Sequence, residues 1–257
     1  MTVAIKLLRD LQRRIAKSNH PEWPDALTEK LWFFEGTGGL HLEFYGSAGG
    51  ESCHKLLDLL CVPEVAAKVV SLVLRGPDEG RDGIREWNLH RLATCHVTFH
   101  HLIRLFVEPT QPGHRHRSTL AGADADGEAV AALLSRLPVL ESLTLPAVTG
   151  RRIFEGMVQP IQELSVDGAA GHHGFIAHLA ASPILPRLQS LDFRDVEDGG
   201  HHTPFADYRA LFESTAFDSV RSLVLREARI APDQLRQLKR LRPDLDITLI
   251  DTRVRFA

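Results

Sequence analysis

A short apolar pattern, apolar-x-x-apolar-x-apolar, recurs along the chain and limits its fold more than any other feature. The complete copies are Val69-Leu72-Leu74, Leu102-Leu105-Val107, Leu140-Leu143-Leu145, Ile161-Leu164-Val166, Leu188-Leu191-Phe193 and Val220-Leu223-Leu225, and a shortened copy is Ile247-Leu249. The last two apolar positions of a copy lie two residues apart, so they point to one face of a strand and their neighbours point to the other. Each copy therefore predicts a half-buried strand.

Helical patterns separate these strands. They cover residues 127–137, 174–181, 205–214 and 232–241, with Pro204 and Pro232 near the first turn, where a missing N–H costs little. Strands that alternate with helices over short links predict a parallel sheet covered by helices on one face. Because the unit recurs at long, uneven intervals, the chain is expected to stack such units one after another.

Two stretches carry a longer motif, Leu-Pro-x-Leu-x-x-Leu-x-Leu, and here the chain resembles the leucine-rich-repeat family. The matching residues are Leu137, Pro138, Leu140, Leu143 and Leu145, and again Leu185, Pro186, Leu188, Leu191 and Phe193. The family often has Asn three residues after the last Leu, where this chain has residues such as Thr110 and Ala228. This departure resembles the irregular, helix-backed bacterial type. The resemblance implies an α/β leucine-rich-repeat solenoid, with a parallel β-sheet on the concave face and helices on the convex face.

We expect two parts: residues 1–60 as an N-terminal helical cap with a degenerate first repeat, and residues 61–257 as one continuous solenoid. The first residues form an amphipathic pattern with Ala4, Leu8, Leu11 and Ile15 on one stripe, which favours a helix that closes the end of the fold over one that lies on a membrane. Residues 39–45 alternate as a strand, residues 52–60 form a helical pattern, and residues 112–126 suggest an exposed loop. Aromatic residues gather at Trp23, Trp32, Phe33 and Phe34, either as a core of the cap or as an exposed anchor.

The family resemblance implies that partners bind the concave face. The candidate residues on the predicted strands are Arg75, Arg104, Phe106, Glu108, Glu163, Ser165, Asp167, Asp192, Arg194 and Arg226. The middle of this series is acidic, at Glu163, Asp167 and Asp192, which suggests a partner with a basic surface. The alternative is a solvated sheet face without a partner, although a parallel sheet with one open face is unusual.

Histidine pairs form a second candidate site. The chain has 14 histidines, and His172-His173 and His201-His202 follow two predicted strands at similar distances. Imidazole suits zinc and related ions, and it also responds to pH near neutrality. These four residues lack the fixed spacing of a helical metal motif, so solvated loops or a partner contact are the competing explanations.

Composition narrows the function class. The formal charge of −3, with 44% hydrophobic and 25% charged residues, is that of an ordinary globular protein, and nucleic acid and membrane partners are not expected. The three cysteines, Cys53, Cys61 and Cys95, contain no Cys-x-x-Cys and are expected to be apolar fillers in a reducing compartment, the cytoplasm. Phosphate-binding and nucleophile motifs are missing from the sequence, so we expect neither a catalytic residue nor a cofactor.

The sequence therefore suggests a non-catalytic protein-binding module. A narrower hypothesis, drawn from the fold resemblance, is an immunity protein that neutralises a bacterial toxin by direct binding. Two alternatives stay open: a metal-dependent enzyme or a metal- or pH-responsive switch built on the histidine-rich edge, and a scaffold subunit of a larger assembly.

Overall fold

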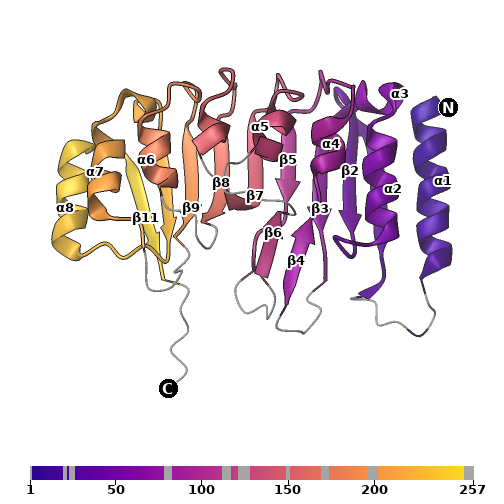
Figure 1. Cartoon of the computed structure of the whole chain (residues 1–257), viewed down its shortest axis with the longest axis horizontal. Helices are drawn as coiled ribbons and strands as arrows, with labels where there is room; N and C mark the ends of the chain where they lie inside the picture. Colours follow the sequence, from indigo (N-terminus) through magenta and orange to yellow (C-terminus); the bar gives the residue numbers. More distant parts are fainter. Residues whose placement is uncertain are drawn as a thin grey trace.

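The computed structural model of the chain is an α/β structure built on a nine-stranded, largely parallel sheet (Figure 1). It describes residues 2–19, 22, 27–77, 83–111, 117–120, 128–148, 151–168, 174–195 and 202–251. The strands of the sheet are β1 (Lys30–Gly36), β2 (Gly39–Tyr45), β3 (Val69–Arg75), β5 (Arg104–Val107), β7 (Ser142–Val148), β8 (Glu163–Gly168), β9 (Ser190–Arg194), β10 (Ser222–Arg226) and β11 (Asp246–Ile250). They lie side by side in the order in which the chain forms them.

Every copy of the apolar pattern forms a strand, as predicted. The prediction that each strand is half-buried is wrong for β3, which is buried on both faces, with Ser71 and Val73 only 8% and 9% exposed. Neighbouring strands from β2 to β11 are parallel, and only β1 and β2 pair antiparallel. The apolar positions stay in register from strand to strand: Leu143 pairs with Leu164, and Leu164 pairs with Leu191. All three are at most 4% exposed, because each strand turns these residues toward the helices.

Helices lie in a row along one face of this sheet (Figure 1). They are α1 (Val3–Ser18), α2 (Glu51–Leu60), α3 (Pro63–Ala66), α4 (His90–Thr94), α5 (Glu128–Leu134), α6 (Phe175–Ala180), α7 (Phe205–Glu213) and α8 (Pro232–Leu241), with short 3₁₀ turns η2 (Arg151–Phe154) and η3 (Thr215–Phe217). The four helices predicted between the strands correspond to α5, α6, α7 and α8, and the helical pattern over residues 52–60 corresponds to α2. The shortest interval between copies, from Leu140 to Ile161, contains η2 in place of an α-helix.

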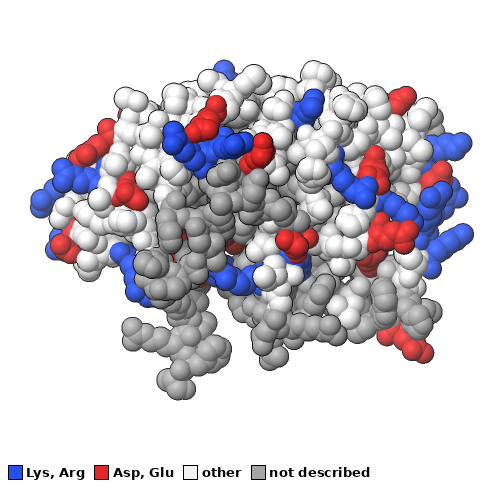
Figure 2. Space-filling view, viewed as in Figure 1, with Lys and Arg blue, Asp and Glu red and all other residues white. Residues whose placement is uncertain are grey.

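The N-terminal helix packs at one end of this row. Its buried residues are Ala4, Leu8, Leu11 and Ile15, the stripe that the sequence predicts, and it contacts β1, α2 and α3. Lys and Arg side chains gather at this end of the molecule (Figure 2).

The sheet continues past residue 60, the predicted division of the chain, because β2 pairs with β3. None of the helices in the described residues has the length and apolar character needed to cross a membrane.

The hairpin β1–β2 depends on a glycine. Gly39 has φ of +149°, and a Cβ atom there would lie 2.2 Å from the carbonyl oxygen of Lys68. The backbone of β2 can approach β3 only without that atom. Leu40, Leu42 and Phe44 of β2 are at most 1% exposed, which confirms the predicted alternation of residues 39–45.

A second, smaller sheet was not predicted. It consists of β4 (Ile84–Trp87) and β6 (Arg117–Leu120), which pair in parallel beside the main sheet (Figure 1). The prediction of an exposed loop over residues 112–126 is therefore wrong for β6, where Ser118 and Leu120 are buried. The polar tetrapeptide Arg-Ser-Thr-Leu gives little sign of a strand, because its burial comes from β4 and not from its own apolar residues.

Candidate functional site

The face of the sheet away from the helices, called here the open face, carries nine of the ten predicted partner residues in the predicted order. They alternate with the buried apolar positions of the same strands, and they are Arg75, Arg104, Phe106, Glu163, Ser165, Asp167, Asp192, Arg194 and Arg226. Most are exposed or half-buried, but Asp167 is only 7% exposed.

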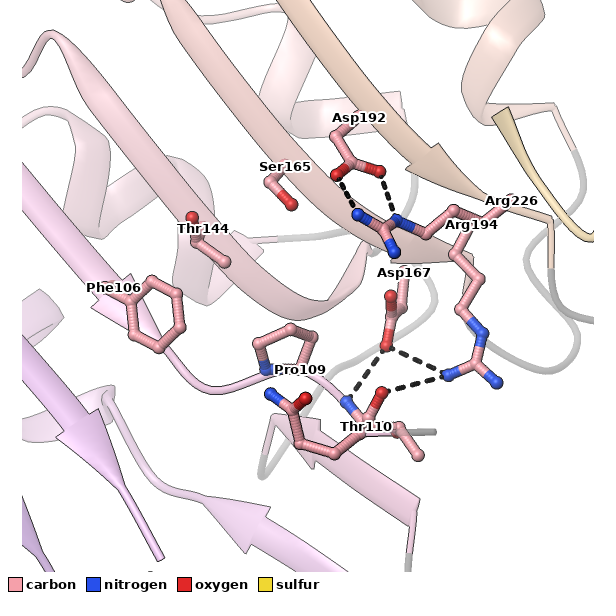
Figure 3. Close-up of a pocket in the computed structure, with 10 residues that line it drawn as sticks. Phe106, Pro109, Thr110, Thr144, Ser165, Asp167, Asp192, Arg194 and Arg226 are labelled. Atoms are coloured by element: carbon pink, nitrogen blue, oxygen red, sulfur yellow. Dashed lines mark hydrogen bonds and ion pairs between the residues drawn. The ribbon is translucent and has the colours of Figure 1, made fainter. Parts of the chain in front are cut away.

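Six of these residues surround one pocket on the open face (Figure 3). The pocket has a volume of about 260 Å³ and is lined by Phe106, Pro109, Thr110, Gln111, Thr144, Ser165, Asp167, Asp192, Arg194 and Arg226. Sheet side chains form its floor, and the segment after β5, residues 109–111, crosses the open face to form one wall (Figure 3). Arg75, Arg104 and Glu163 lie on the same face outside the pocket.

A bidentate ion pair lines one side of the pocket. Arg226 on β10 donates through Nε and Nη2 to the two carboxylate oxygens of Asp192 on β9, both at 2.7 Å. This fork-to-carboxylate geometry is the strong form of such a pair. The hydrogen bond with Asp192 raises the pKa of Arg226. The charge of Asp192 is thus matched within the chain.

A second network fixes the wall of the pocket. The backbone N–H of Thr110 donates to Asp167 Oδ2 at 3.1 Å, and the carbonyl oxygen of Thr110 accepts from Arg194 Nη1 at 3.2 Å. Arg194 also donates through Nε and Nη2 to Glu227 Oε1, at 3.0 and 2.8 Å, and lies 3.8 Å from Asp167. Glu227 has φ of +58°, a left-handed conformation that is costly for a residue with a Cβ atom. The strained Glu227 therefore orients Arg194, and Arg194 in turn fixes Thr110 in the pocket wall.

The carboxyl group of Asp167 titrates near neutrality. Burial raises its pKa to about 7, against the opposing effects of Arg194 and of the Thr110 N–H. Its contacts in Figure 3 both fall on one oxygen, Oδ2. Near pH 7 this buried group therefore changes between its neutral and its charged form.

Glu108, the tenth predicted partner residue, makes contacts within the fold. Its Oε2 accepts from Arg85 Nη1 at 3.0 Å and from the backbone N–H of Gly76 at 3.1 Å, and its side chain is 12% exposed. Little of Glu108 is left accessible to a partner, because its carboxylate is paired with the buried Arg85 on β4. Ser118 on β6 donates to the carbonyl oxygen of Glu108 at 2.7 Å, so the small sheet braces the start of the pocket wall.

The predicted acidic middle of the face is mostly neutralised. Asp192 pairs with Arg226, and Asp167 is buried beside Arg194. Glu163 alone of the three is exposed, where it accepts a hydrogen bond from Ser142 at 3.0 Å. The prediction that this face presents three free carboxylates is therefore wrong. The pairs Asp192–Arg226 and Asp167–Arg194 were not predicted because each arginine reaches a carboxylate on a neighbouring strand.

The aromatic cluster near the N-terminus divides between core and surface. Phe33 packs against the core, whereas Trp32 and Phe34 point to the open face and are 48% and 64% exposed. The cap-core prediction is thus right for Phe33 and wrong for Trp32 and Phe34, while Trp23 lies outside the described residues. Phe34 stacks on His41 with ring centroids 4.7 Å apart.

The histidine-edge hypothesis falls mainly outside the described residues, where His172, His173 and His201 lie. His202 is described: its Nδ1 lies 3.7 Å from Asp195 Oδ2, and both side chains are buried. Asp195 also accepts hydrogen bonds from Thr203 and from Tyr208, and burial raises its pKa. In the described part of the chain, histidine, cysteine and carboxylate side chains do not gather in groups of three or more that could hold a metal ion.

Comparison with known proteins yields no relative: no family model, no curated protein and no solved structure matches the chain.

Proposed function

We propose that this chain is a non-catalytic protein-binding module that engages its partner through the open face of the sheet. One observation carries the proposal: a parallel sheet that is covered by helices on one face leaves the other face open, with aromatic and charged side chains on it. Parallel sheets are usually covered on both faces, since both faces of such a sheet tend to be apolar. An uncovered one fits a surface that a partner covers.

The leucine-rich-repeat assignment is part of this proposal. It is supported by strands that follow one another in chain order, by apolar positions in register from β3 to β11, and by helices on a single face. In such a solenoid each unit buries its apolar side only against its neighbours, and the strand face is left for binding.

The two ion pairs at the pocket favour binding over catalysis. Asp192 is held by Arg226, and Arg194 is held by Glu227, so these charges act mainly on each other. A general acid or base must reach its substrate with an available proton or lone pair. Paired side chains on a wide sheet face suit recognition of a surface better than the chemistry of a bound small molecule.

A narrower form of the proposal is an inhibitor of a toxin, an immunity protein that covers the toxin by direct contact. This form makes an independent demand: the partner alone must harm the cell. Growth of the host should stop when the partner is expressed alone and resume when this chain is co-expressed. A partner that is harmless alone would instead favour a scaffold role.

The test of the binding face uses one blocking substitution and one matched control. Thr144→Arg adds a long side chain in the middle of the open face, and Gln237→Arg adds the same side chain on the exposed surface of α8. The tagged chain and both variants are purified from the native host, and proteins that co-purify are quantified by mass spectrometry. A partner that Thr144→Arg loses and Gln237→Arg retains supports the proposal. A partner retained by Thr144→Arg and lost by Gln237→Arg would move the interface to the helices.

A further inference from the structure

The β1–β5 end of the open face adjoins the pocket, with which it shares Phe106, and large aromatic side chains are exposed on it. Trp32 and Phe34 lie on β1 with 48% and 64% of their surface exposed. The register places Trp32 beside Glu43 and Phe34 beside His41, on the neighbouring strand. Exposed aromatic residues that gather on one surface commonly mark an interaction site, whereas isolated ones do not.

The same surface continues over β3 and β5 with arginines. His41 is in register with Ser71, and Ser71 is in register with Arg104. In the next row Glu43 is followed by Val73 and Phe106. From β1 to β5 this surface spans about 14 Å, three strand spacings, which is enough for a short peptide segment.

One contact joins the aromatic and the cationic groups. The guanidinium of Arg75 lies over the ring of Phe106, 5.2 Å from its centroid, which orients both side chains. We call the whole set the aromatic–arginine surface: Trp32, Phe34, His41, Arg75, Arg104 and Phe106. Tryptophan and arginine are the residue types that most often dominate binding energy at protein interfaces.

The accessible charge on this surface is positive. Arg75 and Arg104 lie on this face of its strands, with Glu43 as an opposing carboxylate. The pair between Arg75 and Glu43 is long, at 3.6 Å, and both side chains are more than 40% exposed, so water screens it. Arg104 is exposed, and it forms no ion pair with any other residue in the described ranges.

The edge of β1 offers a second mode of binding, strand addition, but α1 obstructs it. Gln12 Nε2 of α1 donates to the carbonyl oxygen of Leu31 at 2.7 Å, and α1 packs along β1. An incoming strand would need that backbone acceptor. The geometry therefore favours contact through side chains on the face over pairing at the edge.

We propose that the aromatic–arginine surface binds an acidic protein segment that inserts apolar side chains between Trp32, Phe34 and Phe106. The inference rests on the proposed function and adds the place and the chemistry of the partner. Charge complementarity with Arg75 and Arg104 selects the acidic partner, and contact with the aromatic rings supplies most of the affinity. A partner with a basic surface, the expectation from the sequence, would meet these arginines unfavourably.

The first arm of the test needs no partner. Tryptophan fluorescence is quenched with iodide and, separately, with caesium, in the wild type and in Trp32→Phe; their difference isolates Trp32. Trp87 is fully buried and contributes little to quenching. We expect the ratio of iodide to caesium quenching for Trp32 to be at least about twice the ratio for free N-acetyltryptophanamide at low salt, because local positive charge concentrates anions. A ratio below that of the free compound would overturn the charge assignment.

The second arm uses a displayed library of random short peptides, sorted against the purified chain; the best peptide is then titrated by calorimetry. We expect it to be rich in Asp and Glu around apolar residues, and to lose about ten-fold in affinity with Trp32→Ala or Arg104→Glu, as at hot spots. Matched controls elsewhere are Met157→Ala, an apolar residue that is 65% exposed, and Arg236→Glu on α8, and both should bind normally. Circular dichroism checks that each variant is folded.

The outcomes separate this inference from the function on which it rests. Two outcomes overturn the inference and leave the binding function in place. In the first, the selected peptides are basic. In the second, Thr144→Arg blocks their binding and Trp32→Ala does not affect it. Peptides that only Arg236→Glu or Met157→Ala disturbs contradict both, since the interface then lies outside the open face.

Discussion

Arg194 donates from Nη1 to the carbonyl oxygen of Thr110, a residue 84 positions earlier in the chain, at 3.2 Å. This bond ties the segment after β5 to β9 across two intervening strands, β7 and β8. The backbone N–H of the same Thr110 donates to Asp167 on β8. One residue of the pocket wall is therefore fixed from both sides of its peptide backbone, and the pocket exists because this segment is held over the sheet.

The first prediction concerns the arginine itself. Arg194→Met should lower the free energy of unfolding by about 2–3 kcal/mol, because Glu227 loses its cation and Thr110 loses its donor in a poorly hydrated site. Urea denaturation measures this change. Arg187→Met replaces an exposed arginine and should alter stability by less than about 0.5 kcal/mol. Equal effects of the two substitutions would show that the network contributes nothing to stability.

A second prediction uses the left-handed backbone of Glu227. Glu227→Ala and Glu227→Gly both remove the carboxylate that holds Arg194, but only glycine adopts φ of +58° without strain. The glycine variant should therefore be about 1 kcal/mol more stable than the alanine variant. The urea midpoints of unfolding of the two variants measure this difference. A more stable alanine variant would show that the backbone of Glu227 is not strained.

A third prediction follows from the pKa of Asp167, which burial raises to about 7 from the ordinary value of 3.8. Between these two pKa values the folded chain binds a proton that the unfolded chain does not. The contribution of Asp167 to wild-type stability therefore falls as the pH rises toward 7 and stays at its lowest above pH 7. Asp167→Asn removes the dependence. The difference in free energy of unfolding between the variant and the wild type should therefore shift by about 2 kcal/mol in favour of the variant from pH 5.5 to pH 8. The shift amounts to about 1.4 kcal/mol for each pH unit below 7.

Thermal or urea denaturation at the two pH values measures the difference, and asparagine keeps an oxygen to accept from Thr110. Glu163→Gln, an exposed carboxylate on the same strand, serves as the control and should show no such gain. A parallel pH response of Asp167→Asn and the wild type would mean that Asp167 titrates as an ordinary exposed carboxyl.

The fourth prediction tests the brace formed by the small sheet. Ser118 Oγ accepts from Trp87 Nε1 at 3.2 Å and donates to Glu108 at 2.7 Å, and both side chains are buried. Ser118→Ala should cost about 1–3 kcal/mol, because the indole N–H then lacks its acceptor in a dry environment. The loss appears in urea denaturation. Ser135→Ala, which removes an exposed serine on the helical side, should be nearly neutral.

The main sheet could be predicted from the sequence because its strands obey a simple rule. At Leu143 and Leu145 the apolar residues point inward and Thr144 points outward, and the same alternation recurs on β2, β5, β9 and β10. The small sheet breaks the rule. Ile84 is 69% exposed while its neighbour Arg85 is 6% exposed. Apolar periodicity cannot identify a strand in which one of the two buried side chains is a charged arginine and an exposed one is isoleucine.

The site was predictable in outline and not in detail. Alternation identifies Asp192 and Arg226 as neighbours on the open face, on adjacent strands. It does not reveal that Arg194 is shared with Glu227, or that Thr110 crosses the sheet to meet Asp167. Those contacts depend on the path of segments outside the strands, where no periodic pattern restricts the backbone. The correction of the predicted acidic face follows from them.

The most direct test of the central claim, that the open face is the binding surface, is site-specific photo-crosslinking in the native host. A photoreactive phenylalanine derivative is placed at Phe106 on the open face or at Gln237 on α8, and captured proteins are identified by mass spectrometry. We expect position 106 to capture one dominant protein that position 237 does not capture. Capture of that protein at position 237 and not at position 106 would show that the partner binds the helices and not the open face.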